Sequence, residues 1–124
     1  MNDAEEVLVL AEPIRGPELR RLVEASFGDM VKYVVDVERR LVAIGGELHA
    51  DSEQRLLDQG SRPGDLWGAN YYPGRGRAGC VEYTSLINIR PARGNPGMEI
   101  VDVRIRDQVR SITFELVGEG EALP

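Results

Sequence analysis

Apolar residues recur along the chain at strand spacing and helix spacing in turn, which predicts strands alternating with helices. Residues 7–10 (VLVL) form a short continuous apolar run, as expected of a strand that is buried on both faces or lies at the edge of a sheet. Apolar positions three and four residues apart then predict a helix over 17–27. Pro17 suits the first helical position, and Gly28 suits the position just past the end.

The next segment has the pattern of a β-hairpin. β-branched residues dominate 30–37, where apolar and polar positions largely alternate. A polar turn at 38–40 separates this strand from a second apolar run at 41–44, so we predict an antiparallel pair. Lys32 and Asp36 share one face of the first strand and are expected to form an ion pair there or with the neighbouring strand.

A short helix and two further strands are expected in the second half. Asp51 is the expected cap of a helix over 52–59. Residues 66–72 have the composition of a strand, and the Gly-rich segment 73–79 is predicted to be a flexible link. The longest strand is predicted over 80–90.

The last helix is expected to be capped by Asp102 and to keep its apolar stripe as far as Leu116. The order of elements predicts an α+β fold, with an antiparallel-rich sheet of about five strands and two main helices and one short helix packed on one side. We expect a single domain over 1–124, with an ordered core at about 7–117 and an acidic, flexible tail at 119–124.

The charge composition limits the kinds of molecule that the protein is expected to bind. The 124 residues carry a net charge of −6, which argues against nucleic acid as the partner. Within 61–95, however, five arginines stand against only two acidic residues. A small anionic ligand is therefore compatible with this segment.

The sequence also lacks the marks of membrane insertion or secretion. No apolar run approaches about 18 residues, so no membrane-spanning helix is expected. The first six residues are acidic, unlike the basic start of a signal peptide. Cys80 is the single cysteine, which excludes an internal disulfide. These features predict a soluble cytoplasmic protein.

Four stretches of the chain carry motifs of a known family. They are FGDMVK at 27–32, AIGGELHAD at 43–51, LWG at 66–68 and INIRP at 87–91. On these motifs the chain resembles a small prokaryotic family, the domain-of-unknown-function family 5674, over roughly residues 7–117. The resemblance implies no activity, cofactor or ligand, so the function has to be argued from the residues.

The sequence GRGRAG at 74–79 matches the dinucleotide-binding pattern G-x-G-x-x-G. That pattern requires a strand before the turn and a helix after it, because the helix N-terminus meets the pyrophosphate. Here Pro73 precedes the motif and a strand is expected after it, so we interpret the segment as a hairpin loop. We predict no cofactor.

The segment from Glu47 to Asp51 (ELHAD) contains the only histidine, His49. In an extended chain these three residues would lie on one side. They could then bind a divalent cation, or a carboxylate could orient the imidazole for base catalysis. The structural alternative is that Asp51 caps a helix and His49 makes a local hydrogen bond. No second histidine or cysteine cluster completes a zinc site, and we predict no resident metal.

A second polar group lies at the end of the predicted long strand. Asn88 and Arg90 share one strand face, and Arg93 follows in the loop. Guanidinium and amide groups together suit a carboxylate or a phosphate. The alternative is that the arginines pair with surface acids. On the preceding strand, Trp67 and Asn70 fall on opposite faces, and Trp67 is expected to lie in the core.

Together these groups lead to one hypothesis, a single polar pocket. Its expected lining is Glu47, His49 and Asp51 on one wall and Trp67, Asn70, Asn88, Arg90 and Arg93 on the other. We predict a non-enzymatic binding or regulatory module for a small polar or anionic ligand. One alternative is a hydrolase or metal-assisted enzyme that uses His49. Another is a protein- or RNA-binding module that uses Trp67, Tyr71, Arg75 and Arg77. The sequence does not indicate an oligomeric state.

Overall fold

The computed structural model describes residues 6–124, which form one five-stranded sheet in the order β1-β3-β2-β4-β5. All four neighbouring pairs are antiparallel. The strands are β1 (Val7–Leu10), β2 (Val31–Asp36), β3 (Leu41–Gly45), β4 (Leu66–Tyr71) and β5 (Val81–Glu82). The predicted α+β class, the number of strands and the hairpin of β2 and β3 are confirmed.

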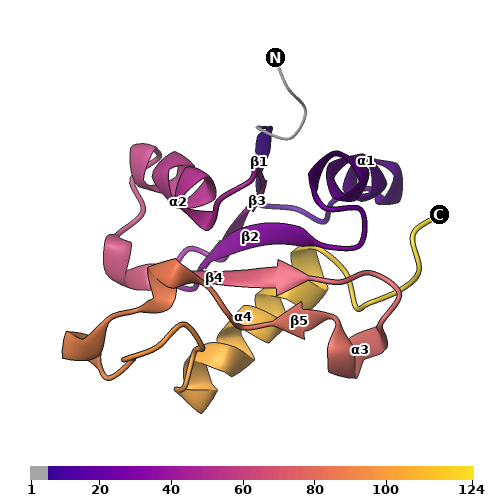
Figure 1. Cartoon of the computed structure of the whole chain (residues 1–124). Coiled ribbons are helices and arrows are strands. Elements are labelled where there is room, and N and C mark those ends of the chain that lie inside the picture. The colour runs from indigo at the N-terminus through magenta and orange to yellow at the C-terminus, as the bar shows by residue number, and fades with distance from the viewer. Residues whose placement is uncertain (1–5) are drawn as a thin grey trace.

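Within residues 6–124, four helices accompany the sheet (Figure 1). They are α1 (Gly16–Ser26), α2 (His49–Asp58), α3 (Gly76–Gly79) and α4 (Val103–Leu116). The two main helices and the short helix expected from the sequence correspond to α1, α4 and α2. The segment predicted to be a flexible link instead contains α3, a single helical turn. None of the helices in the described part of the chain is long and apolar enough to cross a bilayer.

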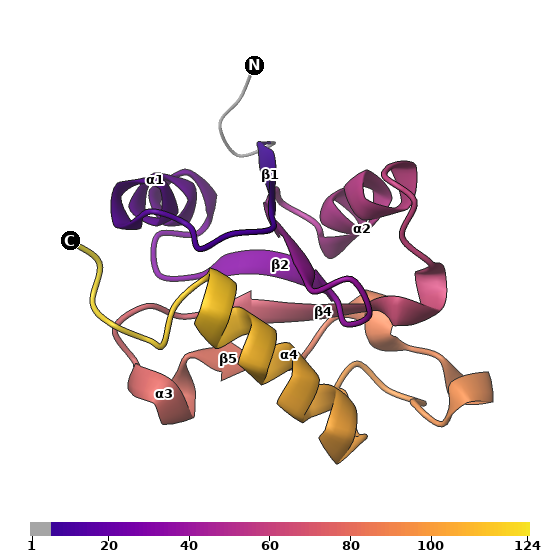
Figure 2. The same ribbon diagram turned by 180° about the vertical axis from the view of Figure 1, so that it is seen from behind.

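The helices cover both faces of the sheet. Along β2, Val31, Tyr33 and Val35 belong to the larger apolar cluster, which includes residues of α1 and α4. Val34 points the other way and belongs to a second cluster with Leu56 of α2. Figure 2 shows α4 lying across the sheet. The expectation that all helices pack on one side was wrong, because both faces of the central strands are apolar and each needs a cover.

The predicted strand over 80–90 was also wrong, since β5 ends after two residues, at Glu82. Beyond it, the Ser85 hydroxyl accepts a hydrogen bond from the Ile87 amide, 3.2 Å away, and the chain forms the 3₁₀ turn Leu86–Asn88. Short polar side chains compete with a strand ladder by bonding the nearby backbone. That competition ends the strand even though apolar residues continue.

The chain after β5 is held against the sheet by Asn88. The Asn88 Oδ1 accepts a hydrogen bond from the Gly68 amide (2.8 Å), and its Nδ2 donates to the Gly68 carbonyl (2.9 Å) and the Met98 carbonyl (3.1 Å). The approach is close, because a Cβ on Gly68 would lie 2.6 Å from the Ser85 Cβ. Glycine in β4 therefore lets the segment around Ser85 pack directly on the strand.

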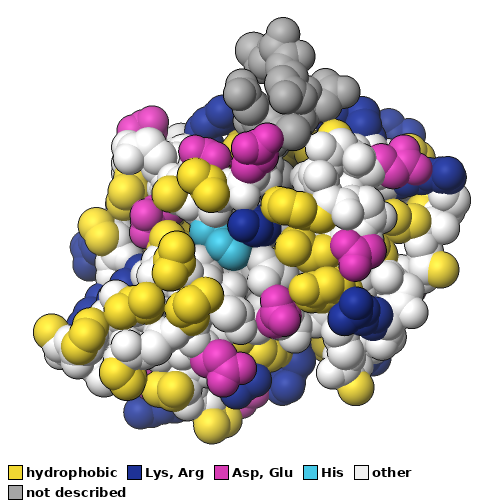
Figure 3. Space-filling model, in the orientation of Figure 1, with side chains coloured by type: hydrophobic (Ala, Val, Ile, Leu, Met, Phe, Trp, Pro, Cys, Tyr) yellow, Lys and Arg dark blue, Asp and Glu magenta, His cyan; other side chains and the backbone are white. Residues whose placement is uncertain are grey.

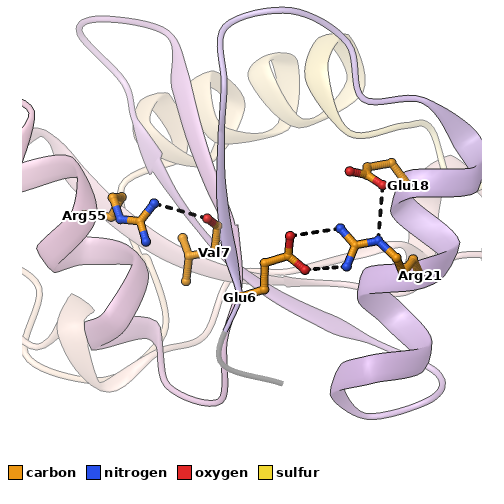
Figure 4. Close-up of polar contacts among 5 residues, drawn as sticks. All are labelled: Glu6, Val7, Glu18, Arg21 and Arg55. Atoms are coloured by element: carbon orange, nitrogen blue, oxygen red, sulfur yellow. Dashed lines mark hydrogen bonds and ion pairs between the residues drawn. The ribbon is translucent and has the colours of Figure 1, made fainter. Parts of the chain in front are cut away.

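The free edge of β1 is flanked by arginines (Figure 4). Arg55 of α2 donates to the Val7 carbonyl at 3.3 Å. From the other side, Arg21 of α1 binds the carboxylates of Glu6 and Glu18. A carbonyl that already accepts a side-chain hydrogen bond is a poorer partner for a strand of another molecule.

The segment after α4 packs on the molecule instead of forming the frayed end that its polar sequence predicts. The Gly120 amide donates to the Tyr71 hydroxyl at 2.9 Å, and the Gly74 amide donates to the Gly120 carbonyl at 3.1 Å. Near the C-terminal end, Arg20 of α1 donates to the carbonyl of Pro124. The acidic tail therefore covers the ends of β4 and α1.

We expect Asn88→Ala to lower the free energy of unfolding by about 3 kcal/mol, because it leaves the buried amide and carbonyl of Gly68 without a partner. Chemical denaturation followed by circular dichroism measures this loss. Leu86→Ala, a truncation two residues away at a side chain that is 71% exposed, is the matched control and should change stability by less than about 0.5 kcal/mol. Equal effects of the two substitutions would contradict the role of the Asn88 carboxamide.

Candidate functional site

A pocket of about 450 Å³ lies between the N-terminal end of α2 and the chain that follows β5. Its floor is the α2-facing side of the sheet. It is lined by Lys32, Leu48, His49, Ala50, Asn70, Glu82, Thr84, Ser85, Leu86, Ile87 and Met98. Figure 3 shows this face, where the only histidine (cyan) lies beside a basic side chain and among apolar side chains. The pocket is thus apolar around its rim and polar at its floor.

The polar floor is a row of three residues across neighbouring strands. Lys32 of β2 pairs with Asn70 of β4, and Asn70 pairs with Glu82 of β5. Paired residues on adjacent antiparallel strands point to the same face, and the strands are about 4.8 Å apart. A lysine, an asparagine and a glutamate therefore lie in a row on one face of the sheet, with roughly 10 Å between the outer Cα atoms.

The Asn70 side chain uses only part of its hydrogen-bonding capacity. It is 7% exposed, and its Nδ2 donates to Glu82 Oε1 at 2.7 Å. Its Oδ1 is buried and accepts no hydrogen bond of good geometry from the described residues, although it lies near enough to the His49 ring to raise the pKa of His49. Nearly all buried polar atoms in proteins have a partner, and an unpaired acceptor costs about 1–3 kcal/mol. An incoming N–H or O–H group would recover that cost.

His49 stands over this row at the first position of α2. Its Nε2 lies 2.8 Å from the Ala69 carbonyl oxygen. A carbonyl only accepts, so Nε2 carries the proton and, in the neutral ring, Nδ1 keeps the lone pair. Burial lowers the pKa of His49, and the nearby Lys32 charge lowers it further, against opposing effects of the Ala69 carbonyl, Asn70 and Glu82. The imidazole is therefore neutral at neutral pH.

The neighbours of His49 in the sequence do not join it. The expectation that Asp51 caps the helix was wrong, because α2 begins at His49 with Leu48 as its N-cap. Asp51 instead occupies the third helical position and accepts a hydrogen bond from the Leu48 amide at 3.4 Å. Glu47 and Asp51 are exposed and are not part of the pocket lining. Within residues 6–124, no three His, Cys, Asp or Glu side chains are grouped as metal ligands would be.

The second predicted group of residues lies outside the pocket. Asn88 is fully buried and committed to the backbone, as described above. Arg90 stacks on Trp67, with its guanidinium carbon 4.6 Å from the ring centroid, and donates to the Leu66 carbonyl. Arg93 is exposed. Of the residues proposed from the sequence, only His49 and Asn70 are brought together in the pocket.

Burial also bears on the proposed docking of RNA. Trp67 is 3% exposed and Tyr71 is 1% exposed, and both belong to the larger apolar cluster. Arg75 stacks on Tyr72 and Arg77 on Phe114, so both loop arginines have aromatic partners of their own. Neither of the two buried rings can offer its face to a nucleobase.

Sequence reasoning did not assign Lys32 or Glu82 to a site. Lys32 was expected to pair with Asp36, but Asp36 instead accepts from the Ser61 hydroxyl at 2.6 Å and from two backbone amides. Glu82 falls in the segment predicted as the long strand. Their alignment on either side of Asn70 depends on the strand order and register, for which the sequence pattern carries no direct signal.

The comparisons with known proteins identify a family but no function. A family model described as "Protein of unknown function (DUF5674)" matches residues 8–116. No curated protein and no solved structure gives a match.

The depressed pKa of His49 predicts a pH-dependent stability. Below the ordinary value of 6.5, the unfolded chain takes up a proton that the folded chain resists, so stability falls as the pH drops from neutral through about 6.5 and levels off below the folded-state pKa. Urea denaturation between pH 7.5 and 5 measures this loss. His49→Gln keeps an N–H for the Ala69 carbonyl but does not titrate, so it should lose less stability over the same range. An identical pH profile for both proteins would show that His49 is not held neutral by folding.

Proposed function

The chain belongs to the DUF5674 family, a family of unknown function, and we propose that it is a binding module for a small amphipathic molecule held in the pocket beside α2. The observation that carries the proposal is the Asn70 Oδ1, which has no hydrogen-bond partner within residues 6–124 and is buried at the floor of a pocket large enough for a small molecule. A ligand that donates a hydrogen bond to this oxygen satisfies an acceptor that the fold leaves open.

The apolar rim supports an amphipathic ligand. Leu48 and Leu86 are among the most exposed large apolar side chains, at 58% and 71%, and Met98 is 42% exposed. All three line the pocket. Burying such side chains against a ligand is favourable by about 25 cal/mol per Å² of apolar surface. The ligand therefore combines an apolar body with a polar end that reaches Asn70.

The enzymatic alternative has less support. Nε2 of His49 is committed to the Ala69 carbonyl, and the carboxylates of Glu47 and Asp51 lie outside the pocket. Burial raises the pKa of Cys80, which keeps its thiol protonated and unreactive. A buried, reduced lone thiol also agrees with our proposal that the protein works in the cytoplasm.

Binding of 4-methylpentanamide, which has a branched apolar body and an N–H donor, tests this function. We expect a dissociation constant of about 1 mM, typical of so small a ligand. In two-dimensional NMR spectra of ¹⁵N-labelled protein, the Asn70 side-chain amide and the Leu86 and Ile87 backbone amides should shift together during the titration.

Two variants and one control localise the binding. Asn70→Ala removes the acceptor and should weaken binding about tenfold. Ala50→Phe adds a ring at an exposed helical position on the pocket wall and should block binding. Gln54→Ala removes an exposed carboxamide on α2, outside the pocket lining, and should leave the affinity unchanged. Undiminished binding by both pocket variants, or no binding by the native chain, would rule out the proposed site.

A further inference from the structure

Among the described residues 6–124, the two charged residues of the pocket floor have no ionic partner. Within residues 6–124, neither Lys32 nor Glu82 takes part in an ion pair, although six other pairs form on the surface. Glu82 accepts hydrogen bonds only from neutral groups, the Asn70 amide and the Tyr72 hydroxyl, at 2.7 and 3.2 Å. The Lys32 ammonium lies 5.2 Å from the centroid of the exposed Phe27 ring. Among the described residues, neighbouring groups therefore hold the Lys32 ammonium and the Glu82 carboxylate in place, but no opposite charge pairs with either.

Both charges act on the interior of the pocket. Lys32 lowers the pKa of His49 and Glu82 raises it, so the field of each charge reaches the imidazole above the row. Positive charge lies on the β2 side of the pocket and negative charge on the β5 side, with the Asn70 carboxamide between them. A ligand with one charge of each sign, a short distance apart, complements this arrangement.

If the pocket is the binding site proposed above, we infer that its ligand is a small zwitterion, a free α-amino acid with an apolar side chain. The carboxylate faces Lys32, and the ammonium faces Glu82 and the Asn70 Oδ1. The apolar side chain packs against Leu48 and Leu86 at the rim. Because Asn70 Nδ2 already donates to Glu82, the free Oδ1 selects an N–H group and thereby fixes the orientation of the ligand.

Ligands with a single charge fit less well. A simple carboxylate would meet Lys32 but would place Glu82 and the unpaired Asn70 oxygen against groups that cannot donate. A simple amine would satisfy Glu82 and Asn70 but leave Lys32 without a partner. The N-terminal residue of a peptide has the ammonium but an amide in place of the carboxylate, so Lys32 distinguishes it from a free amino acid.

Four probes with the same apolar body separate these cases: L-leucine, L-leucinamide, 3-methylbutan-1-amine and 4-methylpentanoate. Isothermal titration calorimetry at low ionic strength should give the tightest binding for L-leucine. Leucinamide and the amine should each bind about tenfold more weakly, and the carboxylate more weakly still. Binding of leucinamide as tight as that of leucine would overturn the role assigned to Lys32 and would point instead to the N-terminus of a peptide.

Charge-removing variants complete the test. Lys32→Gln should bring the affinity for leucine down to that for leucinamide, and Glu82→Gln should reduce the preference for leucine over 4-methylpentanoate to the part that the Asn70 Oδ1 supplies. Arg110→Gln on α4, which removes an exposed charge paired with Asp107, is the control and should retain the full preference. If 4-methylpentanamide binds at Asn70 but leucine binds no better, the zwitterion inference fails while the binding function stands. If no probe shifts the pocket resonances, the binding function itself fails.

Discussion

The pair of hydrogen bonds between the Asn88 carboxamide and the backbone of Gly68 determines where the chain runs after β5, and the pocket depends on that path. The side chain hydrogen-bonds the edge of β4 at Gly68, where a continuation of β5 would otherwise pair. It therefore turns the segment around Leu86 over the α2-facing side of β4. Glycine at position 68 is the other half of this contact, because any larger residue would keep Ser85 away from the strand. One wall of the pocket thus depends on the carboxamide of Asn88 and on the lack of a side chain at Gly68.

Much of the fold could be predicted because local patterns determine it. The hairpin of β2 and β3 follows from β-branched alternation, and α4 follows from a helical apolar stripe behind the Asp102 cap, which accepts from the Arg104 amide as expected. The prediction of a strand over 80–90 was wrong because the apolar pattern of the sequence continues past Glu82, whereas the backbone does not. Around Ser85 and Asn88 the chain forms a 3₁₀ turn in place of strand pairing.

The candidate site was less predictable than the fold. His49 and Asn70 stand out in the sequence as polar residues next to apolar ones, and both line the pocket. The pairing of Lys32 with Asn70 and of Asn70 with Glu82 depends on β4 lying between β2 and β5, which no local pattern specifies. Arg90 was proposed as a ligand for anions, but it stacks on Trp67 because a guanidinium plane and an indole face bury each other's apolar surface.

The position of Lys32 has a practical consequence that concerns chemistry rather than affinity. It is the only lysine in the 124 residues, so it supplies the single side-chain amine of this sequence, and it lines the pocket. Among the side chains, an acylating reagent or a reductively coupled aldehyde will therefore attach a label only at the pocket. A probe can thus be installed at the candidate site without changing the sequence.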